Sequence, residues 1–429
     1  MIHLILKNLW KQSSRNGWLI LELIIVAVIL RQTLDPFIVD KYIQSLPVGF
    51  PTERLYYLSY RSIYKSHPDY RPINAEQRSQ NLRQAIEILG KHKDIENATA
   101  FTEFSTLGSG SSNSQSSIID TVHTPFSIKI LHYLPNSNFF QTFGFNVLEG
   151  ETAYSLDQKE LNDREIVITD LFNSYFKNGR PLTGQKLFLG KEALVKGNYD
   201  KIIVGCVQHV RYNLASYYEP LMFTTHTDDF VSINCTLVFR LKKDVSPTKF
   251  ETEFPDWAKE HLILGNFRPS NLQSFQQEEQ EFLQRSGYNS KYNILLILTV
   301  FLLINVFLGV TGTFWIQTQK RHEEIGIMLS YGGKPRSIIR MLLIEGAVLC
   351  TVCVVIGCLI CLQYILVTQS TDMARNVFGP YSWIDIFPLR FVIISIATYL
   401  IMLFCVLLGV YIPSKRISKM QICDALYNE

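Results

Sequence analysis

Long apolar runs dominate the pattern of hydrophobic and polar positions along the chain. Each run can cross a hydrocarbon layer of about 30 Å, because residues in a helix rise by about 1.5 Å each. The pattern predicts four transmembrane helices, at residues 18–38, 292–316, 338–367 and 389–412. Glu22 interrupts the first run, and a carboxylate at that depth either marks a functional site or pairs with Arg15 or with a neighbouring span.

The positions of the cations indicate how the chain crosses the membrane. Lys and Arg are concentrated before the first run, between the second and third, and after the fourth, as they are on the cytoplasmic side of membranes. We therefore expect both termini in the cytoplasm, with an amphipathic interfacial helix at 1–17, a loop at 317–337 and a tail at 413–429. Residues 368–388 then form an outer loop.

The segment between the first and second runs has the composition of a water-soluble α+β domain, which we place outside the cytoplasm at 39–270. Its periodicity predicts a helix at Asn74–Gly90 and strands at Glu165–Thr169, Lys201–Val207 and Ser232–Leu241. Apolar residues then recur at helical spacing and predict a stalk helix at 271–291, or a peripheral helix packed on the domain. The predicted fold class is an α-helical membrane protein with four transmembrane helices and a large extracytoplasmic α+β domain inserted between the first and second spans.

Composition agrees with a membrane protein that carries a large aqueous domain. Of the 429 residues, 47% are hydrophobic and 18% are charged, which is apolar for a soluble protein but too polar for a chain made only of spans. The formal net charge is +3, from 41 basic and 38 acidic residues. This near balance argues against nucleic acid as a partner.

The loop between the second and third spans has a helical pattern of its own. Ile325, Met328 and Leu329 fall at positions i, i+3 and i+4. Glycines at 332–333 provide a stop, and Pro335 is suited to open the next helix. A short helix is one interpretation of this loop, and a solvated linker is the other.

Five stretches resemble a known family. The segment Glu324-Ile325-Gly326-Ile327, followed by Gly332 and a basic helix start, resembles the REIGI…LGA segment of the FtsX/MacB-like family of ABC transporter permeases. GFNVLEGE at 144–151, the block at 165–189 and the block at 201–223 are similar to the conserved blocks of the MacB-like periplasmic core domain. The ending PSKRISKMQICDAL resembles the family's PARRAARLDPVEAL ending. The order and spacing of the blocks also agree with the family.

The resemblance implies that the loop holds a coupling helix that docks on a cytoplasmic ATPase. The residues carried over to that role are Glu323, Glu324, Ile325, Gly326, Ile327, Met328, Leu329 and Gly332. Two positions depart from the family pattern: Glu323 stands where a basic residue is usual, and Gly333 where alanine is frequent. Both lie on the implied docking surface.

The resemblance also implies partners and a function. Expected partners are P-loop ABC ATPase subunits, the lipid bilayer, an extracytoplasmic partner protein, and a second permease copy or a homologous permease in a dimer. The chain would be a multi-pass protein of the bacterial inner membrane that passes ATP-driven motion to its outer domain, for export of a substrate such as a peptide, antibiotic or lipoprotein. The alternative is a membrane-anchored sensor or scaffold, or a regulator of cell-wall hydrolases, without transport.

Several chemistries find no support in the sequence, so we expect no catalytic residue, metal or cofactor. The chain has no G-x-x-x-x-G-K-[ST] motif, so ATP hydrolysis is expected in a separate subunit. His322-Glu323-Glu324 lacks the second histidine of a zinc-protease helix. Four cysteines at 350–361 lie inside a predicted span, where packing between helices explains them better than metal binding. A disulfide between Cys206 and Cys235 stays open, because it requires Cα atoms within about 7 Å.

Overall fold

The computed structural model describes residues 13–102, 106–108, 113–117, 126–173, 181–188, 201–225, 234–331, 333–368 and 382–418. Most of the predicted interfacial helix and much of the predicted tail lie outside these residues. The chain divides into two compact units, with boundaries after Lys41 and before Ser290. We describe each unit by itself.

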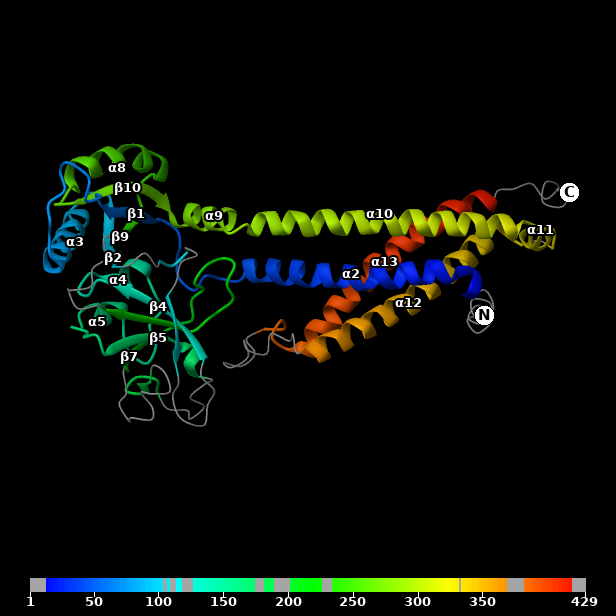
Figure 1. Cartoon of the computed structure of the whole chain (residues 1–429), viewed down its shortest axis with the longest axis horizontal. Helices are drawn as coiled ribbons and strands as arrows, with labels where there is room; N and C mark the ends of the chain where they lie inside the picture. The colour runs from blue at the N-terminus through cyan, green and yellow to red at the C-terminus, as the bar shows by residue number, and fades with distance from the viewer. Residues whose placement is uncertain are drawn as a thin grey trace. The chain divides into compact units, whose positions relative to one another are not determined.

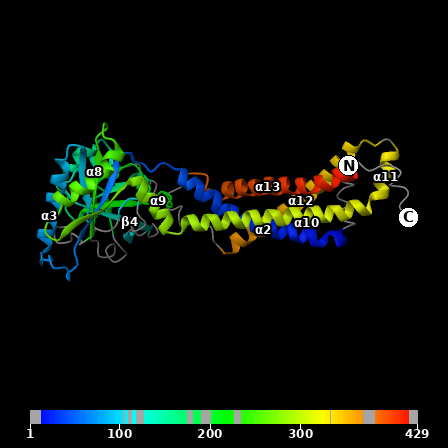
Figure 2. The same cartoon turned by 90° about the horizontal axis from the view of Figure 1, so that it is seen from above.

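The membrane unit is built from long apolar helices. They are α2 (Ser13–Ser45), α10 (Tyr288–Lys320), α12 (Pro335–Thr368) and α13 (Phe387–Ile417), with the short helix α11 (His322–Ser330) between α10 and α12 (Figures 1 and 2). Four helices in the described part of the chain are long and apolar enough to cross a membrane, with a mean hydropathy of 1.9 to 2.8 in their most apolar windows. The prediction of four spans is confirmed.

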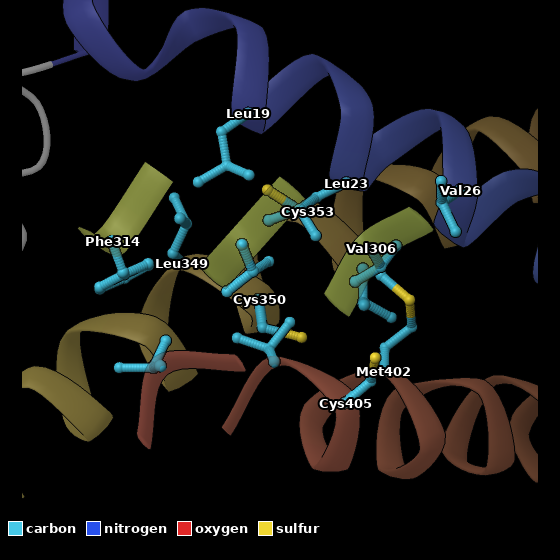
Figure 3. Close-up of a cluster of buried hydrophobic side chains, with 14 of the residues drawn as sticks. Leu19, Leu23, Val26, Val306, Phe314, Leu349, Cys350, Cys353, Met402 and Cys405 are labelled. Carbon is cyan, nitrogen blue, oxygen red and sulfur yellow. The ribbon is translucent and has the colours of Figure 1, made fainter. Parts of the chain in front are cut away.

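Small residues let these helices approach closely around a shared core. Leu19 and Leu23 of α2 point toward Leu349 and Cys353 of α12, with Met402 of α13 in the same cluster (Figure 3). A methyl group added at Gly346 of α12 would meet Val410 of α13 at 2.8 Å, and one added at Gly357 would meet Ala27 of α2 at 3.0 Å. Such contacts hold helices together by dispersion where lipid tails are as apolar as the core.

The outer unit is a mixed sheet with helices on it. Its strands are β1 (Leu55–Ser62), β2 (Ile95–Phe101), β3 (Asn113–Ser117), β4 (Phe126–Tyr133), β5 (Glu165–Thr169), β6 (Lys186–Leu187), β7 (Lys201–Val207), β8 (Leu221–Thr225), β9 (Asn234–Leu241) and β10 (Phe267–Ser274). In the described residues these ten strands form one sheet in the order β10-β1-β9-β2-β4-β8-β5-β7-β6, with β3 paired to β4. The pairs β4–β8 and β5–β7 are parallel. The predicted α+β domain between the first two spans is confirmed (Figure 1).

Helices and buried apolar clusters lie on both faces of the sheet. The helices are α3 (Ala75–Gly90), α4 (Phe139–Phe143), α5 (Ala153–Asp157), α8 (Pro247–His261) and α9 (Phe275–Arg285). Apolar residues of α3 and α8 pack against β1, β2 and β9 (Figure 1). The three phenylalanines of α4 pack with Phe101 and Phe223 in a second cluster. Asn74 caps α3 through a capping box with Gln77, which explains why the helix begins where the sequence predicts.

The stalk segment begins later than predicted. Residues 271–274 belong to β10, because Leu272 and Gln273 pair with Leu58 and Tyr57 of β1. Ser274 accepts a hydrogen bond from the backbone of Gln277 and starts α9 at Phe275. Gly287 has φ of 69° and separates α9 from α10, so the predicted range 271–291 holds a strand end and parts of two helices.

Hydrogen bonds join two of the blocks that resemble the family. The carboxylate of Glu149 accepts from the backbone N–H of Leu182 at 2.6 Å and of Thr183 at 2.9 Å. The Thr183 hydroxyl donates to the same carboxylate at 2.6 Å. These bonds lower the pKa of Glu149, against the opposing effect of its burial. The block at 144–151 therefore fixes the start of the segment that leads to β6.

Cys206 and Cys235 form no disulfide. Both are free and buried, on β7 and β9. Four strands separate β7 from β9 in the sheet. At about 4.8 Å between neighbouring strands, five steps across the sheet place the two thiols far beyond bridging distance.

Candidate coupling site

The short helix α11 is attached to the bundle on one side and open on the other. Ile325 is 1% exposed and packs in the membrane-unit core, in a cluster with Phe314 of α10 and Ile338 of α12. Ile327 is 49% and Met328 45% exposed. Ile327 lies about 200° around the helix from Ile325, at about 100° per residue, so it faces away from the core. The result is an anchored helix with an exposed apolar face.

An ion pair fixes the first turn of α11 to the third span. Arg321 lies at the junction of α10 and α11, and its Nη1 is 2.8 Å from a carboxylate oxygen of Glu345 on α12. The two side chains are only 14% and 12% exposed. Arg321 also approaches Glu324 on α11 at 3.6 Å. The guanidinium thus connects α10, α11 and α12 at one point.

The predicted coupling residues fall into three groups. Glu324, Ile327 and Met328 are exposed, as a docking surface requires. Ile325 and Gly326 are buried, so Ile325 does not share an exposed stripe with Met328, contrary to the prediction. The sequence pattern gave three apolar positions on one face, but it could not tell which face the bundle would cover.

The remaining positions lie outside what the structure describes, and one exposed residue was missed. Nothing is described of the side chains of Glu323 and Leu329, or of Gly332. Tyr331, 90% exposed just after the end of α11, was not predicted. A large aromatic next to an exposed Ile–Met pair is the signal that would have pointed to it. The exposed residues of this segment, among those described, are thus Glu324, Ile327, Met328, Ser330 and Tyr331.

A second polar cluster lies where the outer unit receives the chain from α2 and α9. Arg211, on the segment between β7 and β8, donates to the carbonyl of Ile43 in the last turn of α2. Tyr218 on the same segment donates to the carbonyl of Pro47 at 2.9 Å. Glu279 of α9 is 6% exposed, and its Oε1 has no hydrogen-bond partner. Burial raises the pKa of Glu279 to about 7, although Arg211 acts in the opposite direction.

Two features noted in the spans are placed by the structure. The carboxylate of Glu22 lies 2.6 Å from the point that a Cβ on Gly309 of α10 would occupy, so it faces a neighbouring span. Pairing with Arg15 falls outside the described side chains. Cys350, Cys353 and Cys361 are buried between helices. The described residues hold no group of three or more side chains arranged to bind a metal ion.

Comparison with known proteins adds to this picture. Residues 296–422 match the family model of the FtsX-like permease C-terminal domain. The periplasmic region of MacB from Actinobacillus actinomycetemcomitans is similar at 13% identity, over 56% of this chain and 97% of that one, with a TM-score of 0.33. A permease-protein domain from Porphyromonas gingivalis is 16% identical over 52% of this chain and 93% of its own, with a TM-score of 0.30.

A third similar structure is the extracellular domain of the noncanonic ABC-type transporter YknZ from Gram-positive bacteria. It is 10% identical over 50% of this chain and 100% of its own, with a TM-score of 0.29. No curated protein matches the chain.

These findings define the class as a membrane protein with four apolar helices and an α+β domain between the first two, in which the last three of these helices match a permease domain. Within that class, residues 296–422, which run from α10 to α13, are similar to the FtsX-like permease C-terminal domain. The family predicted from the segment at Glu324–Ile327 is confirmed.

Proposed function

We propose that this chain is the membrane subunit that receives the motion of a separate ATPase and passes it to the outer α+β domain. The ATPase docks on α11, with Ile327, Met328 and Tyr331 at the centre of the contact and Glu324 at its rim. The observation that carries the proposal is the two-sided character of α11: Ile325 is 1% exposed in the core while Ile327 is 49% exposed.

The attachment of α11 to the bundle suits it to transmit force. A solvated linker would absorb a displacement, because nothing would hold its residues to the spans. Here Ile325 packs against α10 and α12, and Arg321 bridges to Glu345 at 2.8 Å. A push on the exposed face of α11 would therefore be passed to two transmembrane helices at once.

The sequence favours a complex in which this chain works with ATPase subunits and a second permease. The chain has no phosphate-binding loop of the G-x-x-x-x-G-K-[ST] type, so we assign ATP hydrolysis to partner subunits. Four spans are few for a substrate path, so the working complex holds a second permease copy or a homologue. Both termini face the cytoplasm of the bacterial inner membrane, and the complex exports a substrate such as a peptide, antibiotic or lipoprotein.

A charge introduced on the exposed face of α11 tests this assignment. In the variant Ile327→Lys/Met328→Lys, neither residue packs in the core, so the fold and membrane insertion should persist. Co-purification of the ATPase should fall at least about tenfold, because central interface residues carry most of the binding energy. The matched control is Ile263→Lys in the outer unit, where the wild-type residue is 47% exposed.

The outcomes separate the two candidate functions. A double variant that retains its ATPase and supports transport at the wild-type rate contradicts a docking role for α11. If the wild-type chain purifies in mild detergent without any ATPase, a membrane-anchored sensor or scaffold becomes the better assignment.

A further inference from the structure

A single arginine is buried among the transmembrane helices. Arg31 of α2 is 2% exposed. Its guanidinium lies 4.2 Å from the ring centroid of Phe391 on α13, and its Nε is 3.5 Å from the Ser395 hydroxyl. Its Nη1 is buried and has no hydrogen-bond partner. Arg31 also interacts with the Cys361 thiol of α12. These contacts still leave Nη1 without a hydrogen-bond partner.

An N–H donor without a partner is costly at the depth of Arg31 in the membrane. Its Cα is fourteen residues beyond Gly17, or about 21 Å along the helix, within a hydrocarbon layer of about 30 Å. Of the two carboxylates on this part of α2, Asp35 lies one turn away, and Glu22 is nine residues or about 13 Å along the helix from Arg31, too far to neutralise the guanidinium. Charged residues at such depth are rare and mark functional sites by default.

A second arginine, Arg390 of α13, pairs with Asp35, which follows Arg31 by one turn on α2. Arg390 of α13 donates from Nε and Nη2 to the two carboxylate oxygens of Asp35 on α2, at 2.9 and 3.1 Å. Arg390 and Asp35 are 23% and 21% exposed, so this pair is open to the surroundings while Arg31 lies beneath it. Arg31 and Arg390 thus lie on neighbouring helices, and Asp35, one turn after Arg31 on α2, pairs with Arg390.

We propose that Arg31 and Arg390 form a binding site for the phosphate of a lipid headgroup, at the end of the bundle that leads into the outer domain. A guanidinium presents N–H donors in a planar fork that matches phosphate oxygens, so the free Nη1 of Arg31 supplies the missing contact. Asp35 holds the second guanidinium in position. Phe391 covers Arg31 and must rotate to admit the phosphate.

The depth of the site favours a lipid over a soluble anion. A phospholipid places its phosphate just outside the hydrocarbon layer, and a long basic side chain can extend about one helical turn toward it. The inference goes beyond the proposed function, since it concerns a ligand of the spans and holds whether or not α11 docks on an ATPase.

The test uses the full-length chain in a phosphate-free detergent and measures its thermal midpoint and lipid retention by native mass spectrometry. Short-chain phosphatidylglycerol is the probe, with inorganic phosphate and a diacylglycerol of the same chain length as comparisons. We expect phosphatidylglycerol to raise the midpoint and to be retained. In Arg31→Met the affinity should fall at least about tenfold, as for loss of a hydrogen bond to a charged group.

A matched control removes a nearby cation outside the site. Lys291 of α10 lies 3.2 Å from Asp40 and is 56% exposed, so Lys291→Gln changes the net charge of the unit without touching the buried guanidinium. This variant should bind the lipid as the wild type does. Without lipid, Arg31→Met should be as stable as the wild type or more stable, because it removes an incompletely paired charge.

Each outcome has a clear meaning. Equal protection by inorganic phosphate and phosphatidylglycerol, lost in Arg31→Met, supports the site with a soluble phosphate as its ligand. Equal protection by diacylglycerol overturns the proposal, because no phosphate is then recognised. Unchanged lipid retention in Arg31→Met, or an equal loss in Lys291→Gln, overturns it as well.

Discussion

The membrane unit and the outer unit treat buried charges in different ways. In the outer unit, Arg240 is 6% exposed and donates to four backbone carbonyls, those of Pro51, Glu53, Thr142 and Phe143, at 2.8 to 3.0 Å. In the membrane unit, Arg321 and Arg390 each pair with a carboxylate on another helix. The same side chain is satisfied by loops in one unit and by a counter-charge in the other.

Backbone availability explains the difference. A long helix uses its carbonyls for its own hydrogen bonds, so a charge inside a helical bundle finds only side chains. Loops and helix ends in the outer unit leave carbonyls free, and these carry partial negative charge without the cost of burying a second ion. Arg31 is the exception in the membrane unit, because it has neither kind of partner for its Nη1.

Removing Arg240 should have the largest effect. Arg240→Met leaves four carbonyls without their donor, two of them in buried hydrogen bonds. We expect a loss of about 3–5 kcal/mol in the stability of the outer unit, as when one partner of a buried charged network is removed. Hydrogen exchange of the β9 amides in the full-length protein measures it. Arg285→Met, at a side chain 61% exposed, serves as control and should change stability by less than about 0.5 kcal/mol. Equal effects of the two variants would show that the backbone contacts of Arg240 contribute little.

A second experiment concerns the carboxyl group of Glu279 on α9, which is buried and has one oxygen without a hydrogen-bond partner. Its pKa is raised from 4.5 to about 7, chiefly by burial. The folded state therefore binds more protons than the unfolded state between these values, so this contribution to stability is present at pH 4.5 and is lost as pH rises through about 7. The change is on the order of 3 kcal/mol.

Glu279→Gln should flatten that pH dependence when hydrogen exchange of α9 is followed from pH 4.5 to 7.5. The neighbouring charged and titratable groups are Arg211, Tyr57, Tyr212 and Glu278. The pKa of Glu278 is also raised by burial, so it contributes with the same sign. Glu278→Gln is therefore the control, and the profile should keep most of its slope there. An unchanged slope in Glu279→Gln would assign the pH dependence to another group.

The smallest effect is expected at the ion pair that holds α11. Glu345→Gln keeps the shape of the side chain but removes the counter-charge of a guanidinium that is 14% exposed. We expect α11 to lose protection by about 1–2 kcal/mol, measured by hydrogen exchange of its amides. Glu324→Gln is a matched control, because Glu324 approaches the same guanidinium at 3.6 Å but is 68% exposed. If both variants loosen α11 equally, burial is not what gives the pair its strength.

The two units also differ in how far sequence could predict them. Apolar runs and helical spacing are local, so the four spans, α3 and the short helix α11 could be predicted from the sequence. The strands β5 and β7 could be located, but their neighbours could not: β1 pairs with β9 and β10, and Tyr56 lies opposite Ser274 across more than two hundred residues of chain. No local pattern records such pairing.

At the candidate site, too, the local sequence pattern could not reveal the contacts made by parts of the chain that are distant in sequence. Spacing placed Ile325 and Met328 on one face of α11, but their environments depend on α10 and α12, which the spacing does not describe. Arg31 and Asp35 could be noticed as charges in a span. Their partners Ser395 and Arg390 are separated from them by 364 and 355 positions.

The pairing of β1 with β10 has a consequence for how such a protein could have arisen. Because the first and last strands of the outer sheet are adjacent and antiparallel, the polypeptide enters and leaves that unit at neighbouring points, with Tyr56 opposite Ser274. Chain ends that lie together are the condition under which a whole module can be inserted into a host sequence or exchanged for another. The hydrophobic spans could thus acquire, lose or replace their outer module in one genetic event, while α11 and its contacts with the bundle stayed as they were.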